Sequence, residues 1–322
     1  MGDLPQERVS RCRPFLNVGV DYCGPFYIKE KRFRNRNKLK VYVALFTSLT
    51  TKAVHLELVS DLITEAFIAS LKRIFARTGI SQNIHSDNAT NFVRANRELV
   101  KLYEFFQSEE HNKGVKEFLN HQKITWKLIP PRSPHFGGLW EAAVKSVKRH
   151  LSWTIGDALL TFEQLGTCIV EIEAILNSCP LSPLSSDPND LQPLTPGHFL
   201  IGGPLISFTQ LDFKDFTSNR LSAWQHAQRL RHHFWNRWQK KYLTQLTVRS
   251  KWNSSSSQLI KLGTMFVIKE DNLPPLQWKL GRIVATHPGT NGIIRVATVK
   301  TEVGEYKRCI KKLCPLPIEP SS

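Results

Sequence analysis

Three acidic residues stand in sequence contexts that suit metal-assisted chemistry: Asp21, Asp87 and Glu141. Asp21 lies within a β-branched apolar run, and Asp87 follows a second such run where a strand would stop. Glu141 comes directly after a loop rich in proline and glycine, at the start of an expected helix. Carboxylates at two strands and one helix start can hold a pair of divalent cations, and hard oxygen ligands suit Mg²⁺. Two such ions activate an attacking oxygen and stabilise a leaving one in phosphoryl transfer.

Two longer segments give these residues a family context: 130–141, which reads PPRSPHFGGLWE, and 194–202, which reads LTPGHFLIG. With the three acidic residues they resemble the integrases of BEL/Pao-type LTR retrotransposons, a branch of the retroviral integrase family. The resemblance covers nearly the whole chain. It implies an RNase H-like catalytic core in which Asp21, Asp87 and Glu141 bind two Mg²⁺ or Mn²⁺ ions. Asp87 and Glu141 are further apart here than in retroviral integrases, and a surface insertion at about 94–114 accounts for the difference.

Each acidic residue also has a simpler structural interpretation. Asp21 could turn the chain towards the Gly24-Pro25 bend, since aspartate is common in turns. Asp87 could cap the helix that follows it. Glu141, Lys145 and Lys148 lie on one helix face and could form an ordinary surface ion pair. We favour the metal-binding role for the carboxylates because three of them occur together in the family context, and we expect the two lysines to contact the phosphates of a DNA end.

The segment before Glu141 is expected to form a mobile active-site loop. It combines stiff and permissive residues, namely Pro134, His135, Gly137 and Gly138. His135 is a possible phosphate contact.

The charge of the chain is concentrated near its C-terminus. Residues 220–322 hold 18 Lys and Arg against 5 Asp and Glu, a net charge of +13 out of +17 for the whole chain. A basic region next to a nearly neutral core indicates a polyanionic partner, and nucleic acid is the commonest one. The alternative is a basic surface that serves solubility. The predicted DNA contacts outside the core are Arg237, Lys240, Lys241, Lys279, Arg282, Lys307 and Arg308.

The six cysteines and eleven histidines do not have the spacing of a zinc site. We therefore expect the cysteines to be buried thiols. Retroviral-type integrases carry a zinc module of two histidines and two cysteines before the core, and residues 1–14 are expected to be the linker that follows such a module.

The hydrophobic pattern predicts an α/β core at 15–180. Strands are expected at 15–28, 41–48, 53–59, 80–87 and 124–129. Helices are expected at 61–79 with Asp61 as N-cap, and at 94–107, 112–121, 139–154 and 161–177. Three strands followed by alternating helices and strands favour a mixed five-stranded sheet with flanking helices.

Beyond the core, residues 181–257 are expected to form a Pro/Ser-rich extension followed by a basic, Trp-rich helix at 219–244. We interpret the aromatic stripe of this helix as packing, because aromatic residues at helical spacing more often serve a core than stack on bases. Short strands at 264–269, 278–285, 293–300 and 305–308 predict a small SH3-like β-barrel at 258–318 that binds DNA.

The family resemblance implies a retrotransposon-type integrase that uses divalent metal for 3′-end processing and DNA strand transfer, and the three carboxylates suit its metal chemistry. Its expected partners are element ends, target DNA and further copies of the chain, with no membrane and no small-molecule substrate. We expect nuclear residence, preceded by a cytoplasmic particle if the chain belongs to an active element. Two alternatives stay open: a catalytically idle or co-opted DNA-binding scaffold derived from such an integrase, and a ribonuclease H or junction nuclease with the same fold.

Overall fold

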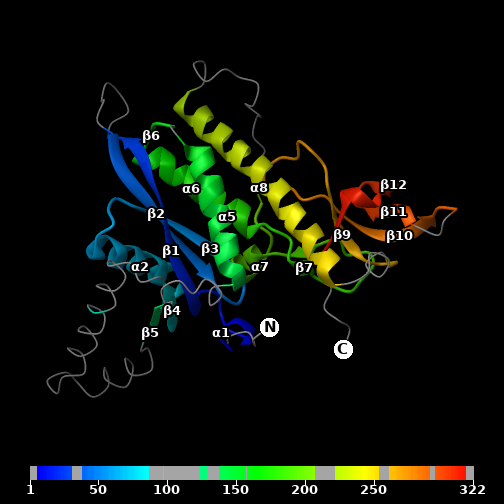
Figure 1. The fold of residues 1–322 in the computed structure, drawn as a ribbon, viewed down its shortest axis with the longest axis horizontal. Helices are drawn as coiled ribbons and strands as arrows, with labels where there is room; N and C mark the ends of the chain where they lie inside the picture. The colour runs from blue at the N-terminus through cyan, green and yellow to red at the C-terminus, as the bar shows by residue number, and fades with distance from the viewer. Residues whose placement is uncertain are drawn as a thin grey trace. The chain divides into compact units, whose positions relative to one another are not determined.

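The computed structural model describes residues 6–30, 38–86, 97, 124–128, 138–156, 158–206, 222–253, 261–290 and 294–316 (Figure 1). The chain forms two compact units. The first comprises 1–173 and 217–230, and the second comprises 174–216 and 231–322. The points of division lie within two helices. They do not test the domain boundaries expected at residues 14, 180 and 257, which stay predictions.

A mixed sheet forms the centre of the first unit (Figure 1). Its strands are β1 (Asn17–Lys29), β2 (Lys38–Ser48), β3 (Val54–Val59), β4 (Asn83–Ser86) and β5 (Thr125–Leu128). Their spatial order is β3-β2-β1-β4-β5, and the short β6 (Leu160–Thr161) pairs with the end of β1. The first three strands pair antiparallel, whereas β4 joins β1, and β5 joins β4, in parallel. The expected RNase H-like mixed sheet is confirmed.

The chain connections explain this mixture of directions. Strands that follow each other closely can pair antiparallel, whereas a parallel pair needs a crossover segment. Helix α2 (Thr64–Thr78) lies in the crossover that leads from β3 to β4. The other helices of this part of the chain are the short α1 (Gln6–Val9), α5 (Gly138–Ile155) and α6 (Phe162–Asn177).

Alternating side chains of β1 contact helices on opposite faces of the sheet. Tyr22 makes an edge-on aromatic contact with Phe67 of α2, at 6.0 Å between ring centroids. The neighbouring residues of the strand, Asp21 and Cys23, instead contact α5 through Lys148. Because successive side chains of a strand point to opposite faces, α2 and α5 lie on the two sides of β1.

The predicted helix 61–79 is confirmed in type but not in its N-terminal detail. The helix begins at Thr64 with Ile63 as the N-cap residue, so the prediction of Asp61 as N-cap is wrong. Ile63 is exposed, whereas Phe67, Leu71 and Ile74 are buried. The helices expected at 94–107 and 112–121 lie outside the described residues, apart from the isolated position 97.

Tryptophans of the long helix α8 (Ala223–Asn253) organise the core of the second unit. Trp235 is fully buried and donates a 2.8 Å hydrogen bond to the carbonyl of Leu273, and Trp238 donates to the thiol of Cys179. Trp278 packs edge-on against Trp235, at 4.9 Å between ring centroids. The predicted packing role of the aromatic stripe is confirmed for Trp235 and Trp238. The helix also runs nine residues beyond the predicted end at 244.

An antiparallel sheet completes the second unit. Its strands are β9 (Met265–Ile268), β10 (Leu280–Pro288), β11 (Ile294–Thr301), β12 (Gly304–Cys309) and β13 (Leu313–Pro315), the last preceded by a 3₁₀ turn, Ile310–Lys312. The order is β12-β11-β10-β9-β13, and within the described residues no pairing joins β12 to β13. The predicted small β unit is present as an antiparallel sheet that does not close within the described residues, and its SH3-like character stays a prediction. Shorter elements precede it, namely β7 (Ser182–Pro183), β8 (Pro193–Leu194) and α7 (Pro196–Ile201).

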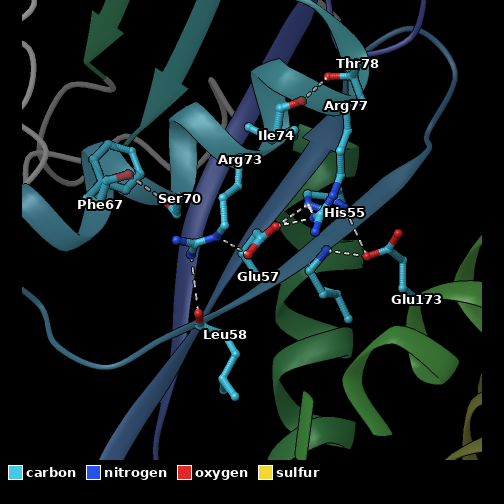
Figure 2. Close-up of polar contacts among 11 residues, drawn as sticks. His55, Glu57, Leu58, Phe67, Ser70, Arg73, Ile74, Arg77, Thr78 and Glu173 are labelled. Carbon is cyan, nitrogen blue, oxygen red and sulfur yellow. Dashed lines mark hydrogen bonds and ion pairs between the residues drawn. The ribbon is translucent and has the colours of Figure 1, made fainter. Parts of the chain in front are cut away.

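A buried charged cluster fixes edge strand β3 to two helices of the first unit (Figure 2). The His55 ring contacts Glu57 through Nε2 and Glu173 of α6 through Nδ1, each at 3.1 Å. Arg73 of α2 donates to Glu57 at 2.7 Å, and Arg77 pairs with the same carboxylate. Glu173 also accepts a 2.8 Å hydrogen bond from the backbone N–H of Leu56. An edge strand carries unpaired backbone donors, and here a helix side chain satisfies one of them.

Both titratable groups at the centre of the cluster have shifted pKa values. Burial disfavours the charged imidazole of His55, but hydrogen bonds to Glu173 and Glu57 outweigh it and raise the pKa of His55 to about 9. Burial likewise disfavours ionised Glu57, but hydrogen bonds from His55 and Arg73 lower the pKa of Glu57 to about 2. His55 and Glu57 are therefore both charged near neutral pH.

The stability of the protein should depend on pH through this cluster. A raised folded-state pKa gives a contribution that is present below the unfolded value of 6.5 and is lost as pH rises through about 9. We expect the free energy of unfolding to fall by about 3 kcal/mol between pH 6 and pH 9. Urea denaturation at both pH values measures it. His55→Gln should remove this slope, and His287→Gln should retain it; a slope unchanged by His55→Gln would contradict the assignment.

Candidate active site and basic surface

Asp21 lies in the body of β1 and pairs with Leu45 of β2. On the other side of β1, the parallel pairing with β4 ends two residues earlier, where Gly19 pairs with His85. One carboxylate oxygen of Asp21 accepts a 2.7 Å hydrogen bond from the N–H of Tyr22. The turn interpretation is therefore wrong, because the strand continues past Asp21 and its pairing shifts only between Cys23 and Phe26.

The other oxygen of Asp21 faces a cation. Lys148 of α5 places its Nζ 2.5 Å from Asp21 Oδ2, and both side chains are about a quarter exposed. The pair is therefore within reach of solvent and of a ligand. The sequence indicated that Lys148 lies near a phosphate site but did not identify Asp21 as its partner.

Cys23 lies behind this pair and was not predicted as part of the site. Its buried thiol lies 3.7 Å from the carbonyl oxygen of Lys148 and 3.9 Å from the hydroxyl of Ser152. Burial raises the pKa of the Cys23 thiol, which keeps it neutral. The available signal was its spacing: residues two apart in a strand share a face, so Cys23 packs α5 on the face that carries Asp21.

Of the predicted triad, only the side chain of Asp21 is described by the structure. Asp87 follows Ser86, the last residue of β4, and lies outside the described residues, as do Pro134, His135 and Gly137 of the predicted loop. Gly138 is the first residue of α5. Glu141 lies in the first turn of α5, and its side chain is not among those described. Within the described side chains, no group of three His, Cys, Asp or Glu forms a metal site.

The end of β4 is nevertheless firmly held. Ser86 is fully buried and accepts a 2.8 Å hydrogen bond from the indole N–H of Trp126 in β5. Trp126 packs edge-on against Phe67 of α2, which also contacts Tyr22 next to Asp21. Aromatic packing beneath the sheet thus connects Asp21 with the strand end that precedes Asp87.

The predicted DNA-contacting residues differ in their exposure to solvent and in the contacts that their side chains make. Lys145, Arg237, Lys240, Lys241 and Lys307 are exposed. Lys240 lies 3.6 Å from Asp271, with both side chains largely in solvent, where an ion pair contributes little. Lys279 pairs with Glu270 at 2.7 Å, and this hydrogen bond raises the pKa of Lys279. The guanidinium carbon of Arg308 lies 4.2 Å from the centre of the Tyr306 ring.

Arg282 must be removed from the predicted DNA contacts. Its side chain is buried and donates hydrogen bonds of 2.9–3.1 Å to the backbone carbonyls of Ser185, Asp190 and Gly263. A guanidinium whose donors serve three chain segments joins them together, and its burial removes it from contact with phosphate. Basic composition alone does not separate this role from DNA binding.

Two substitutions distinguish these roles. Arg282→Met should lower the free energy of unfolding by about 2–4 kcal/mol, because it removes the hydrogen bonds that a buried guanidinium donates to three backbone carbonyls. Lys307→Gln should change the free energy of unfolding by no more than about 0.5 kcal/mol. It should also reduce the slope of log DNA affinity against log salt concentration by about one. Denaturation and fluorescence anisotropy over a salt series measure the two effects. A stable Arg282→Met protein with weakened DNA binding would reverse our assignment.

Comparison with known proteins gives limited matches. Residues 222–316 match the model of a family described as of unknown function, DUF5641. No curated protein matches the chain. A chain of a cryo-EM structure of a simian T-cell lymphotropic virus intasome in complex with the PP2A regulatory subunit B56 gamma is similar at 13% identity and a TM-score of 0.37, over 99% of this chain and 85% of that one. A TM-score of this size does not establish a common fold. No helix in the described ranges combines the length and apolar character needed to cross a membrane.

Proposed function

We propose that this chain is a metal-dependent DNA strand-transferase of the retroviral integrase type. In the proposed reaction, water first cleaves a phosphodiester near the 3′ end of the element DNA. The exposed 3′-hydroxyl then attacks a phosphodiester of target DNA, so that one phosphorus–oxygen bond forms as another breaks and the target strand leaves as a free 3′-hydroxyl. The observation that carries the proposal is the position of Asp21 on β1, beside the end of β4 and against α5.

The strand register supports a shared site for two of the carboxylates. Gly19 pairs with His85, and Asp21 and Asp87 each come two residues later in the sequence. Two residues along a strand return to the same face. We therefore propose that Asp87, which lies outside the described residues, shares a metal site with Asp21.

The face of α5 supports the third member. Glu141 precedes Lys148 by seven residues, which is about two helical turns, so both positions lie on the same side of α5. Lys148 reaches Asp21, and that side of the helix therefore faces β1. We therefore propose that Glu141 is the third member of the site.

The donor set fits divalent cations. Three carboxylates offer hard oxygen ligands, and Asp21 already has a cationic ammonium group 2.5 Å from one oxygen. When bound, Mg²⁺ or Mn²⁺ would neutralise charge on the reacting phosphate. Asp21, Asp87 and Glu141 would hold the ions, and the lysines of α5 would orient the DNA end.

Strand transfer tests the proposal directly. The full chain is incubated with a labelled terminal-repeat oligonucleotide, target DNA and Mn²⁺, and joined products are resolved on a denaturing gel. We expect Asp21→Asn, Asp87→Asn and Glu141→Gln each to lower the rate at least about 100-fold, since each removes a charged ligand. Asp61→Asn is a matched control, because Asp61 is exposed and does not cap α2.

Each outcome separates the alternatives. Unchanged activity in the three variants with the wild type active would disprove the site. DNA binding without products from any protein would favour the scaffold alternative. Cleavage of RNA–DNA hybrids without joining would favour a ribonuclease H.

Lys148 should compete with the metal and then bind DNA. We expect Lys148→Gln to tighten Mn²⁺ binding several-fold, because it removes the cation next to Asp21. The same change should weaken binding of the DNA end and lower its salt dependence by about one ion. Calorimetric Mn²⁺ titration and anisotropy measure the two effects. Lys145→Gln, one turn away and exposed, should leave Mn²⁺ affinity unchanged. Equal effects of the two variants on Mn²⁺ affinity would contradict a specific role for Lys148.

A further inference from the structure

One face of the paired ends of β1 and β2 carries three lysines and a tyrosine. In the antiparallel register, Tyr27 lies opposite Lys40, and Lys29 lies opposite Lys38. Residues directly opposite each other share a face, and so do residues two apart in one strand. Tyr27 is 43% exposed, Lys38 and Lys40 are exposed, and Lys29 is partly exposed. These four residues form a continuous surface, which we call the lysine ribbon.

The other face of the same strand ends is anchored in the core of the first unit. Phe26 and Ile28 of β1 are each 3% exposed, and Val41, which pairs with Phe26, is 2% exposed. The short strand β6 pairs with β1 at Ile28 and Lys29, on the edge of β1 that β2 leaves free (Figure 1). The backbone beneath the lysine ribbon is therefore held by a neighbouring strand on each side.

The lysines of the ribbon are not neutralised by acidic partners. Elsewhere in the first unit, Lys127 forms an ion pair with Glu7. Within the described residues, no ion pair engages a lysine of the ribbon. Like charges directly opposite each other on neighbouring strands repel, and Lys29 and Lys38 are arranged in this way. A bound anion would relieve this repulsion.

The beginning of α8 adds positive charge near the ribbon. Burial lowers the pKa of His226 in α8, and the charges of Arg229 and Lys29 lower it further. The charged neighbours that shift His226 are thus both cations, and all three residues belong to the first unit. Glu30, the acidic residue next to Lys29 in the sequence, follows the end of β1 and lies outside the cross-strand pairs. The electrostatic potential between the ribbon and α8 is therefore positive.

A regularly spaced polyanion complements this surface. Lys38 and Lys40 are two residues apart on one strand, a span of about 6–7 Å, and Lys29 lies one strand spacing away, about 4.8 Å. Cations in such an array can approach different phosphates of one nucleic-acid backbone. The exposed hydroxyl of a tyrosine can donate a hydrogen bond to a phosphate oxygen. Contacts of this kind give affinity without reading the bases.

We propose that the lysine ribbon binds the phosphate backbone of duplex DNA, independently of base sequence. The choice of DNA as the polyanion rests on the proposed function, whereas the cationic face needs neither bound metal nor the carboxylates. The ribbon adds a second contact surface to the first unit, in which the sequence predicted only Lys145 and Lys148 as DNA contacts.

Fluorescence anisotropy without divalent metal tests the proposal on the full chain, with a labelled DNA duplex of arbitrary sequence and a salt series. The double variant Lys38→Gln, Lys40→Gln should weaken binding by about tenfold and reduce the slope of log affinity against log salt concentration by about two. The double variant Lys72→Gln, Lys261→Gln removes the same charge from exposed lysines outside the ribbon and should change the affinity by less than about twofold. Equal weakening by the two double variants would overturn the proposal.

Lysine footprinting of the wild-type protein needs no substitution. Acetylation by an N-hydroxysuccinimide ester, read by mass spectrometry, should slow at Lys38 and Lys40 by at least about fivefold when the duplex is bound, and should stay unchanged at Lys72. Equal acetylation of the ribbon with and without the duplex would overturn the proposal. Protection by duplex RNA or by polyglutamate, with none by duplex DNA, would also overturn it, because the partner would then be RNA or an acidic protein.

The two proposals can fail separately. In an Asp21→Asn background, which is expected to abolish strand transfer, the ribbon double variant should lose the same affinity for DNA as in the wild type. Ribbon-dependent DNA binding by a wild-type protein that forms no joined products would reject the catalytic proposal alone. Strand transfer by a protein whose DNA affinity is unchanged in the ribbon double variant would reject the ribbon alone.

Discussion

Parallel pairing between β1 and β4 sets the geometry on which the candidate active site depends. It aligns Asn17, Val18 and Gly19 with residues 83–85, although the two strands are more than 60 positions apart in the sequence. A register shift of one residue would move every side chain of β4 to the other face. Trp126 and Ser86 secure the end of β4, and Cys23 holds α5 beside the same stretch of β1. The site is thus supported by hydrogen bonds and packing from both faces of the sheet.

The charged cluster at β3 provides a different kind of support. Buried ions cost free energy unless they are paired, and the pairs here are complete enough to keep His55 and Glu57 ionised. The cluster joins an edge strand to α2 and α6 through side chains that come from three separate segments. It leaves the carboxylate at Asp21 as a separate polar centre, exposed enough to meet a ligand. The cluster around His55 and Glu57 thus stabilises the fold, whereas the carboxylate of Asp21 is accessible to a ligand.

In the second unit, positive charge has more than one use. Arg282 holds three backbone segments together, and Arg231 of α8 is buried. Arg237 and Lys307 are exposed. Arginine suits the buried positions because its long stem packs against apolar groups and its fork satisfies several acceptors. A net charge of +13 therefore overstates the charge available to DNA.

The sequence by itself determined the five strands and the helices α2, α5 and α6 of the core, the extended conformation around Asp21 and the packing role of Trp235 and Trp238. These features follow from local periodicity and residue type, which decide the face of an element that is buried. Periodicity does not identify the partner of a buried side chain. The tertiary structure alone decided that Lys148 pairs with Asp21, that Arg282 is buried, that His55 joins two glutamates and that, within the described residues, the edge strands β12 and β13 do not pair. Each of these depends on contacts between residues far apart in the chain, whose register and distance no local pattern encodes.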